Sequence, residues 1–217
     1  MRGLYGYFAR RPHWFLLLLY PVVGFCFFFF KEFNTAPAYL MEWPGVDRAI
    51  PFVPWMIVPY LFWYAAVAFP FFWLGTRDPS AFKRYCWFIY GAMMSTYVLY
   101  LLFPNGQNLR PSLDGLDGWD VAAVRWLYAY DAPRNCNPSL HVVDTMAVWF
   151  ALARDASWRK RPWLQTLLAL VCVAIIASTV FVKQHSVIDI LGGLAWSTVW
   201  WVIVYWRRPA SVKNLAR

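Results

Sequence analysis

The chain has 217 residues, of which 61% are hydrophobic, 21% aromatic and only 14% charged. A soluble domain carries about 25% charged residues, so this composition argues against a soluble globular protein and favours a membrane protein. The net charge of +9 would suit a nucleic-acid partner, but the basic residues lie in short segments between apolar runs, as in the loops that orient a membrane protein. We therefore expect a membrane partner and no nucleic acid.

Six apolar runs follow one another along the chain, and a membrane-spanning helix needs about 17–25 mostly apolar residues. A cleaved signal peptide is the alternative for the first run, but its length favours a retained helix. The second run holds three prolines, so its helix should be kinked or begin late. The predicted fold is all-α, a single membrane domain over residues 1–217. We predict a six-transmembrane-helix bundle with helices at about residues 14–30, 52–74, 85–104, 139–153, 162–182 and 186–206.

Lysine and arginine are unevenly divided between the two sets of alternate loops. If the N-terminal side is cytoplasmic, the inner segments hold 14 of the 20 basic residues and the outer segments hold 6. Because cytoplasmic loops are enriched in Lys and Arg, we predict a multi-pass protein of the cell membrane with both termini cytoplasmic. The sequence gives no indication of an oligomeric state.

The longest gap between apolar runs, residues 105–138, falls on the outer side. A loop of this length is often functional, although a plain connector is the alternative. Within it, Trp119–Tyr130 is half apolar and aromatic, which is typical of a short amphipathic helix lying along the membrane surface. The four cysteines form no Cys-x-x-Cys pair and suggest packing, so we expect neither a metal site nor a cofactor.

Three polar segments adjoin the apolar runs, and all three fall on the outer side. They are Arg110-Pro111 after the third run, Asn135–His141 at the start of the fourth, and Lys183–Asp189 at the start of the sixth. The helices were counted without reference to these segments, so the placement of all three on one membrane face is an independent observation.

The second polar segment has the features of a helix start. Asn137 is a good N-cap and Pro138 is favoured at the first helical position. The amides of Ser139 and Leu140 would then be free to bind an anion such as phosphate, with His141 on the first turn. An ordinary capped helix with an interfacial histidine is the alternative.

The third polar segment pairs His185 with Asp189 four residues later, on one helix face. A carboxylate that accepts from one ring nitrogen fixes the histidine tautomer and raises the basicity of the other nitrogen, as a nucleophilic histidine requires. An ionisable residue inside an apolar run is a functional hypothesis by default, and a structural pair is the alternative. Gly192 and Gly193 follow and would allow close helix packing.

Together these groups suit phosphoryl transfer without a metal. One imidazole would attack phosphorus, cations and amides would hold the equatorial oxygens, and the second imidazole would protonate the leaving oxygen.

The three segments resemble the motifs of the type 2 phosphatidic acid phosphatase superfamily, Lys-x6-Arg-Pro, Pro-Ser-Gly-His and Ser-Arg-x5-His-x3-Asp. Arg110-Pro111 is similar to the end of the first motif, and Pro138–His141 to the second, with Leu140 in place of glycine. Ser178, His185 and Asp189 match the third at the family's spacing. The resemblance covers about residues 85–195.

The resemblance implies that His185 is the nucleophile, forming a phosphohistidine, that Asp189 orients it, and that His141 is the general acid. It also implies a phosphate-binding set formed by Arg110, Ser139 and Leu140. Two family cations are absent, because Phe103 and Thr179 occupy their positions. We hypothesise that Lys183 replaces one of them.

These departures are similar to the branch near inositol-phosphorylceramide and sphingomyelin synthases, which transfer a head group to an alcohol. We therefore expect a lipid-phosphate phosphatase acting at the outer membrane face, with a lipid phosphotransferase as the alternative. A lipid transporter and an inactive scaffold are less favoured, because the ionisable groups gather at one end of the helices.

Overall fold

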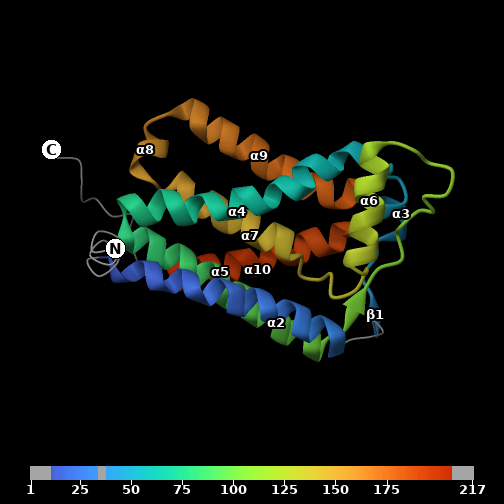
Figure 1. Ribbon diagram of the computed structural model, residues 1–217, viewed down its shortest axis with the longest axis horizontal. Helices are drawn as coiled ribbons and strands as arrows, with labels where there is room; N and C mark the ends of the chain where they lie inside the picture. The colour runs from blue at the N-terminus through green and yellow to red at the C-terminus, as the bar shows by residue number, and fades with distance from the viewer. Residues whose placement is uncertain (1–10, 34–37, 207–217) are drawn as a thin grey trace, which may run out of the picture.

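The computed structural model describes residues 11–33 and 38–206, which form a bundle of helices that run along one long axis and alternate in direction (Figure 1). Six helical segments make up the length of the bundle. They are η1 with α2 (Pro12–Leu18 and Leu19–Phe33), η2 with α4 (Pro54–Met56 and Ile57–Arg77), α5 (Pro79–Leu102), α7 (Leu140–Ala153), α9 (Pro162–Phe181) and α10 (Val187–Tyr205). Each predicted range lies mostly in one of these segments.

Prolines shape the second helical segment as expected. The 3-10 turn Pro54–Met56 precedes the regular helix, so α4 begins at Ile57, and Pro70 lies within it. The delayed start follows because a proline lacks the amide hydrogen and restricts the residue before it.

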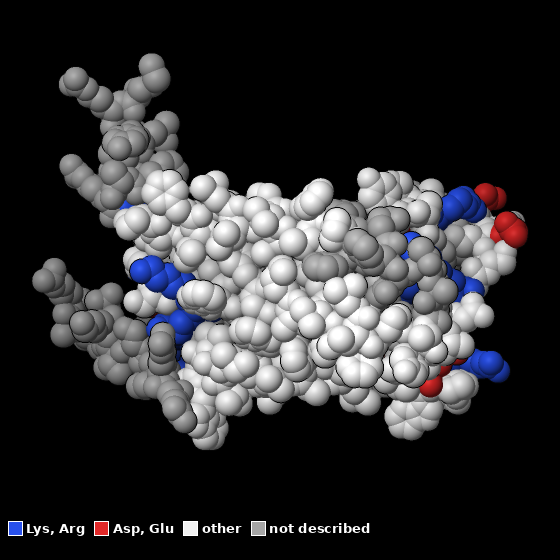
Figure 2. All heavy atoms as spheres, turned by 90° about the horizontal axis from the view of Figure 1, so that it is seen from below, with Lys and Arg blue, Asp and Glu red and all other residues white. Residues whose placement is uncertain are grey.

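The bundle has the surface of a membrane protein. In the described part of the chain, four helices are long and apolar enough to span a bilayer, Pro54–Arg77, Pro79–Leu102, Pro162–Phe181 and Val187–Tyr205. Two shorter apolar helices, Pro12–Cys26 and Leu140–Ala153, accompany them. On the face drawn in Figure 2, charged side chains lie at the two ends of the molecule and the surface between them is uncharged. The protein is therefore membrane-embedded.

Shorter elements cover the two ends of the bundle. Helix α6 (Trp119–Tyr130), predicted from its amphipathic pattern, crosses one end of the long helices (Figure 1). At the same end, strand β1 (Tyr39–Leu40) pairs in parallel with β2 (Asn105–Gly106), close to helix α3 (Pro44–Asp47). Helix α8 (Ala156–Arg159) lies at the opposite end. The fold is thus mostly helical with very little sheet.

Helices α7 and α10 approach each other closely at two glycines. A Cβ on Gly193 would lie 2.7 Å from Val142 Cβ and 3.0 Å from the Ser139 carbonyl oxygen. A Cβ on Gly192 would lie 2.5 Å from Asn137 Oδ1. The close packing predicted for these glycines is confirmed, and it brings the start of α7 against the first turns of α10.

Candidate active site

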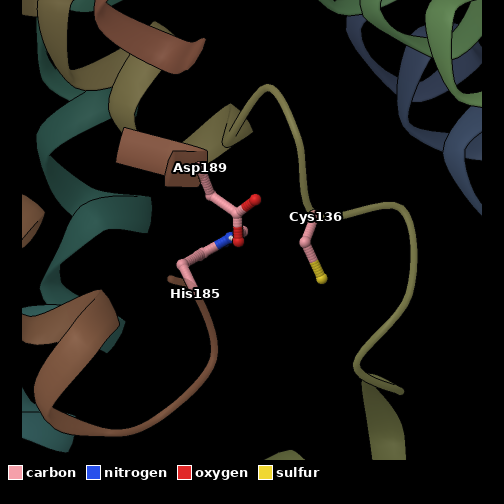
Figure 3. Close-up of side chains that lie close together, drawn as sticks. All are labelled: Cys136, His185 and Asp189. Atoms are coloured by element: carbon pink, nitrogen blue, oxygen red, sulfur yellow. Dashed lines mark hydrogen bonds and ion pairs between the residues drawn. The ribbon is translucent and has the colours of Figure 1, made fainter. Parts of the chain in front are cut away.

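The start of α10 is organised around the carboxylate of Asp189, which is fully buried. Its Oδ2 accepts a hydrogen bond from the Ser186 amide at 2.9 Å, while the Ser186 hydroxyl accepts from the Asp189 amide at 3.2 Å. This reciprocal capping box defines the helix start. The same Oδ2 lies 3.3 Å from His185 Nδ1 (Figure 3). One carboxylate therefore caps the helix and orients the histidine.

The second histidine, His141, is held by aromatic rings in the first turn of α7. Its ring stacks on Tyr60 and Trp63 of α4, with centroid separations of 4.2 and 4.4 Å. The ring centroid of His185 is 6.0 Å away. His141 Nε2 is buried and has no hydrogen-bond partner among the described residues. Stacking fixes the ring plane and leaves this nitrogen available.

Both histidines line a single cavity of about 280 Å³. Its walls come from α2, α4, α5, α6, the loop before α7, and the starts of α7 and α10. Aromatic side chains dominate the lining, and the polar groups among them include Asp131, Arg134 and Gln184. A cavity with apolar walls and a few convergent polar groups is the usual form of a small-molecule site.

The family model described as "PAP2 superfamily" matches residues 84–213, which is more than half of the chain and includes all three polar segments. The chain belongs to the PAP2 superfamily. Neither the search of curated proteins nor the search of solved structures found a match. PAP2 membership confirms the predicted family and indicates phosphatase-type hydrolase activity in a membrane. The suggested branch near the sphingolipid synthases stays a prediction.

The second PAP2 segment folds differently from the predicted helix start. Helix α7 begins at Leu140 with Ser139 as its N-cap, not at Pro138 with Asn137 as cap. The Asn137 side chain instead donates to the Ile188 carbonyl at 3.1 Å, and the Ser139 amide donates to the Asp189 carbonyl at 3.2 Å. The Ser139 amide is thus engaged with α10, whereas the Leu140 amide stays among the first helical N–H groups, which have no carbonyl partner within the helix.

Arg110, the arginine similar to that of the first PAP2 motif, contacts Gln184, the residue before His185. Arg110 donates to the side chain of Gln184 and to the backbone carbonyls of Asp131 and Tyr128, the last at 3.1 Å. Its guanidinium also stacks over the Tyr128 ring at 4.2 Å. Burial lowers the pKa of Arg110, and Tyr128 and Asp131 oppose that shift. Arg110 does not line the cavity; it supports Gln184, which does.

Lys183 does not replace a missing PAP2 cation, because the structure turns it away from the cavity. Its backbone has a φ of 54°, and its ammonium donates to the carbonyls of Asp47 at 2.8 Å and Ile50 at 2.5 Å. Burial lowers the pKa of Lys183, and Asp47 opposes the shift. This lysine fastens the turn before His185 to the segment around α3.

Asp47 also joins the segment around α3 to the residues that follow His185. Its role was not recognised from the sequence. Its Oδ1 accepts from the Val187 amide at 2.8 Å, and its Oδ2 accepts from the Trp43 amide at 2.6 Å. Asp47 is 1% exposed, so these amides have little access to water. The residues on either side of His185 are therefore held by a segment 140 residues earlier in the chain.

We expect Asp47→Ala to lower kcat about tenfold or more while leaving KM nearly unchanged, because two amides lose their buried acceptor, at about 1–3 kcal/mol, and the turn carrying His185 loosens. Phosphate release by the purified protein measures this. Asp155 is the matched control, since it caps α8 at the opposite end by accepting from the Ser157 and Trp158 amides. Asp155→Ala should lower stability without lowering kcat, and equal kcat values for both variants would contradict a positioning role for Asp47.

Arg134 is the cation that sequence reasoning missed. It is half-buried and lines the cavity together with both histidines. It lies four residues before Pro138 in the loop between α6 and α7. This closeness to the second polar segment was the only indication in the sequence that Arg134 could reach the site. None of the three motifs includes it, yet it brings a cation to the cavity of a chain that lacks the motif lysine and arginine.

Cys136 was expected to be a packing residue, yet it lies beside two other side chains that can bind a metal. Its Sγ, a ring nitrogen of His185 and a carboxylate oxygen of Asp189 all lie within 4.8 Å of one another. Burial raises the pKa of the Cys136 thiol. Since the thiolate is the reactive form, this thiol is a poor nucleophile.

Proposed function

We propose that this protein is an integral membrane lipid-phosphate phosphatase that works through a phosphohistidine on His185. The proposal rests on one observation above all: His141 and His185 face the same cavity with ring centroids 6.0 Å apart, and His185 is backed by a buried carboxylate. A nucleophile oriented by a carboxylate, with a second proton-transfer group nearby, is the arrangement that displacement at phosphorus requires.

The first step is attack on the phosphate ester. With Nδ1–H of His185 donating to Asp189, the lone pair lies on Nε2 and forms the N–P bond. The bond between phosphorus and the lipid oxygen breaks, and protonated His141 gives its proton to that oxygen. The ring of His141 is fixed by Tyr60 and Trp63, so the proton is delivered from a constant direction.

The second step returns the enzyme to its starting state. Water enters the space left by the lipid alcohol, and His141, now neutral, accepts its proton. The oxygen bonds to phosphorus, the N–P bond breaks, and inorganic phosphate leaves. Every proton moves between His141 and the two oxygens, so the cycle needs no cofactor, and we propose that it is independent of a metal ion.

The phosphate oxygens would be held by Arg134 and by the Leu140 amide at the start of α7. Arg134 supplies the positive charge that Phe103 and Thr179 do not. The hydroxyl of Thr179 donates to its own helix at Ile176, which leaves it unsuited to the task. Ser139 is fully buried and its hydroxyl has no hydrogen-bond partner among the described residues, so it can donate to a phosphate oxygen.

Arg134→Gln is expected to lower kcat/KM about 10–100-fold, because a hydrogen bond to a charged group contributes about 1.5–3 kcal/mol. Initial rates at several lipid-phosphate concentrations measure the change. Arg125 on α6 is the matched control, since it is exposed, donates to the Leu113 carbonyl at 3.1 Å and does not line the cavity. An effect of Arg125→Gln as large as that of Arg134→Gln would contradict a specific phosphate contact.

The substrate would be a lipid whose chain follows the aromatic wall of the cavity. This wall includes Tyr20 of α2 and Tyr64 of α4, both within long apolar helices of the bundle. We further propose six membrane spans with both termini cytoplasmic, because 14 of the 20 basic residues fall on that side. The cavity would then open at the extracytoplasmic face.

Phosphate release from several lipid phosphates tests the proposal. Phosphatidic acid, a polyprenyl pyrophosphate and phosphatidylglycerol phosphate would be offered to the purified protein with and without an added alcohol. Release of inorganic phosphate in the absence of alcohol supports hydrolysis. A phosphorylated alcohol as the main product would replace hydrolysis by the phosphotransferase reaction, and no product from any substrate would contradict both.

A further inference from the structure

Three potential metal ligands meet at the base of the cavity. Cys136, on the loop before α7, lies opposite the His185–Asp189 pair at the start of α10 (Figure 3). All three residues are buried, with 3%, 9% and 0% of their surfaces exposed. Their ligand atoms lie within 4.8 Å of one another, and His185 Nδ1 is 3.3 Å from Asp189 Oδ2.

We propose that Cys136, His185 and Asp189 bind a thiophilic divalent cation such as Zn²⁺, and that the bound cation holds the enzyme in an inactive state. Zinc takes thiolate, imidazole and carboxylate ligands at about 2.0–2.3 Å in a tetrahedral arrangement, which separates the ligand atoms by about 3.3–3.7 Å. His185 Nδ1 and Asp189 Oδ2 already have this separation, and Oδ1 is the other oxygen of the same carboxylate. A shift of about 1 Å in the cysteine side chain would bring its sulfur into the same range.

A second observation points to a ligand at this place. Asp189 Oδ1 is buried and has no hydrogen-bond partner among the described residues, while Oδ2 serves both His185 and Ser186. A buried carboxylate oxygen without a partner is unfavourable, and a cation is a partner that satisfies it. Coordination through Oδ1 would leave the capping bond to the Ser186 amide in place. The cavity supplies access and room for water as the fourth ligand, because Cys136 and His185 both line it.

Coordination would inactivate His185 through its tautomer. A metal on Nδ1 needs the lone pair of that nitrogen, so the single ring proton must lie on Nε2. Nε2 then has no lone pair with which to attack phosphorus. The Cys136 thiol gives its proton to solvent as the metal–sulfur bond forms, and nothing is oxidised or reduced. Metal binding stands independently of the proposed function, whereas inhibition rests on it.

Cobalt binding tests the site without reference to activity. Purified, metal-stripped protein in detergent would be titrated with Co²⁺, and a thiolate-to-cobalt charge-transfer band is expected to saturate at one equivalent. Cys136→Ser should abolish the band, and Cys136→Ala provides a second variant if the serine protein does not fold. Cys172→Ser is the matched control, since Cys172 is also a free, buried cysteine. A missing band in the unaltered protein, or a band that survives in both Cys136 variants, would overturn the site.

Zinc inhibition of phosphate release tests whether the bound cation inactivates the enzyme. The ratio of phosphate release with and without Zn²⁺ would be measured for each protein, and Cys136→Ser is expected to need at least tenfold more Zn²⁺ for half-inhibition, since losing one ligand weakens a site by about this factor or more. A cobalt band together with full activity in saturating Zn²⁺ would overturn inhibition. A cobalt band in a protein that releases no phosphate under any condition would support the metal site and overturn the proposed function instead.

Discussion

His185→Gln is expected to reduce phosphate release from a lipid phosphate by about 10⁴-fold or more, to the background rate, as loss of a covalent nucleophile does in other enzymes. Glutamine is similar in size and polar, but its amide has no lone pair able to attack phosphorus. The reaction would be followed with purified protein at saturating substrate. His13→Gln is the matched control, because His13 is a buried histidine whose Nε2 lies 2.9 Å from the Gly75 carbonyl, well outside the cavity.

Trapping the intermediate adds a second measurement. The protein would be mixed with radiolabelled substrate and quenched at neutral or alkaline pH, because a phosphohistidine is acid-labile. Labelled protein should appear with the native sequence and with His13→Gln, and be missing with His185→Gln. If His185→Gln still released phosphate at the native rate, another residue would have to be the nucleophile.

Asp189→Asn should lower kcat by about 10²–10⁴-fold, with little change in KM. The carboxylate selects the tautomer with the proton on Nδ1, whereas an asparagine amide can present its own N–H to Nδ1 and so move the ring proton to Nε2. Because Oδ2 faces both His185 Nδ1 and the Ser186 amide, an asparagine that turns its N–H to Nδ1 gives up the capping bond, so stability should also fall by about 1 kcal/mol.

Ser186→Ala provides the comparison for Asp189→Asn. It removes the hydroxyl that accepts from the Asp189 amide and leaves the carboxylate facing His185. This variant should lower stability by about 1 kcal/mol, as loss of an N-cap does, and keep most of its activity. Equal kcat losses in the two variants would mean that Asp189 acts through the helix start alone and does not set the tautomer.

The elements with strong local signals were predictable from the sequence. Long apolar runs bounded by prolines and charges define the six helical segments, and the mixed composition of Trp119–Tyr130 indicated α6 with its observed bounds. The His185–Asp189 contact was predicted from a shared helix face, but His185 precedes the N-cap Ser186 and lies outside α10. The two side chains meet because the capping turn folds His185 back toward the carboxylate of Asp189. Order along the chain and alternation of helix direction brought the polar segments to one end.

The side-chain partners of the loops were not predictable, because they depend on contacts between distant segments. Lys183 is close to His185 in sequence, yet its positive φ directs it to carbonyls more than 130 residues away. Asn137 has the composition of an N-cap, but Ile188 on α10 competes for its side chain. Arg134 and Cys136 belong to a loop without periodicity, so no pattern in the sequence could show that they reach the cavity.

The turn that carries His185 is anchored to Asp47, so the proposed catalytic unit extends beyond the three motif segments. The family match begins at residue 84, so Asp47 and the two rings that clamp His141 lie upstream of it. A fragment that began at residue 84 would contain His141 and His185 but would lack Tyr60, Trp63 and Asp47. If the proposed function holds, substitutions in the first third of the chain would change turnover while every motif residue is kept.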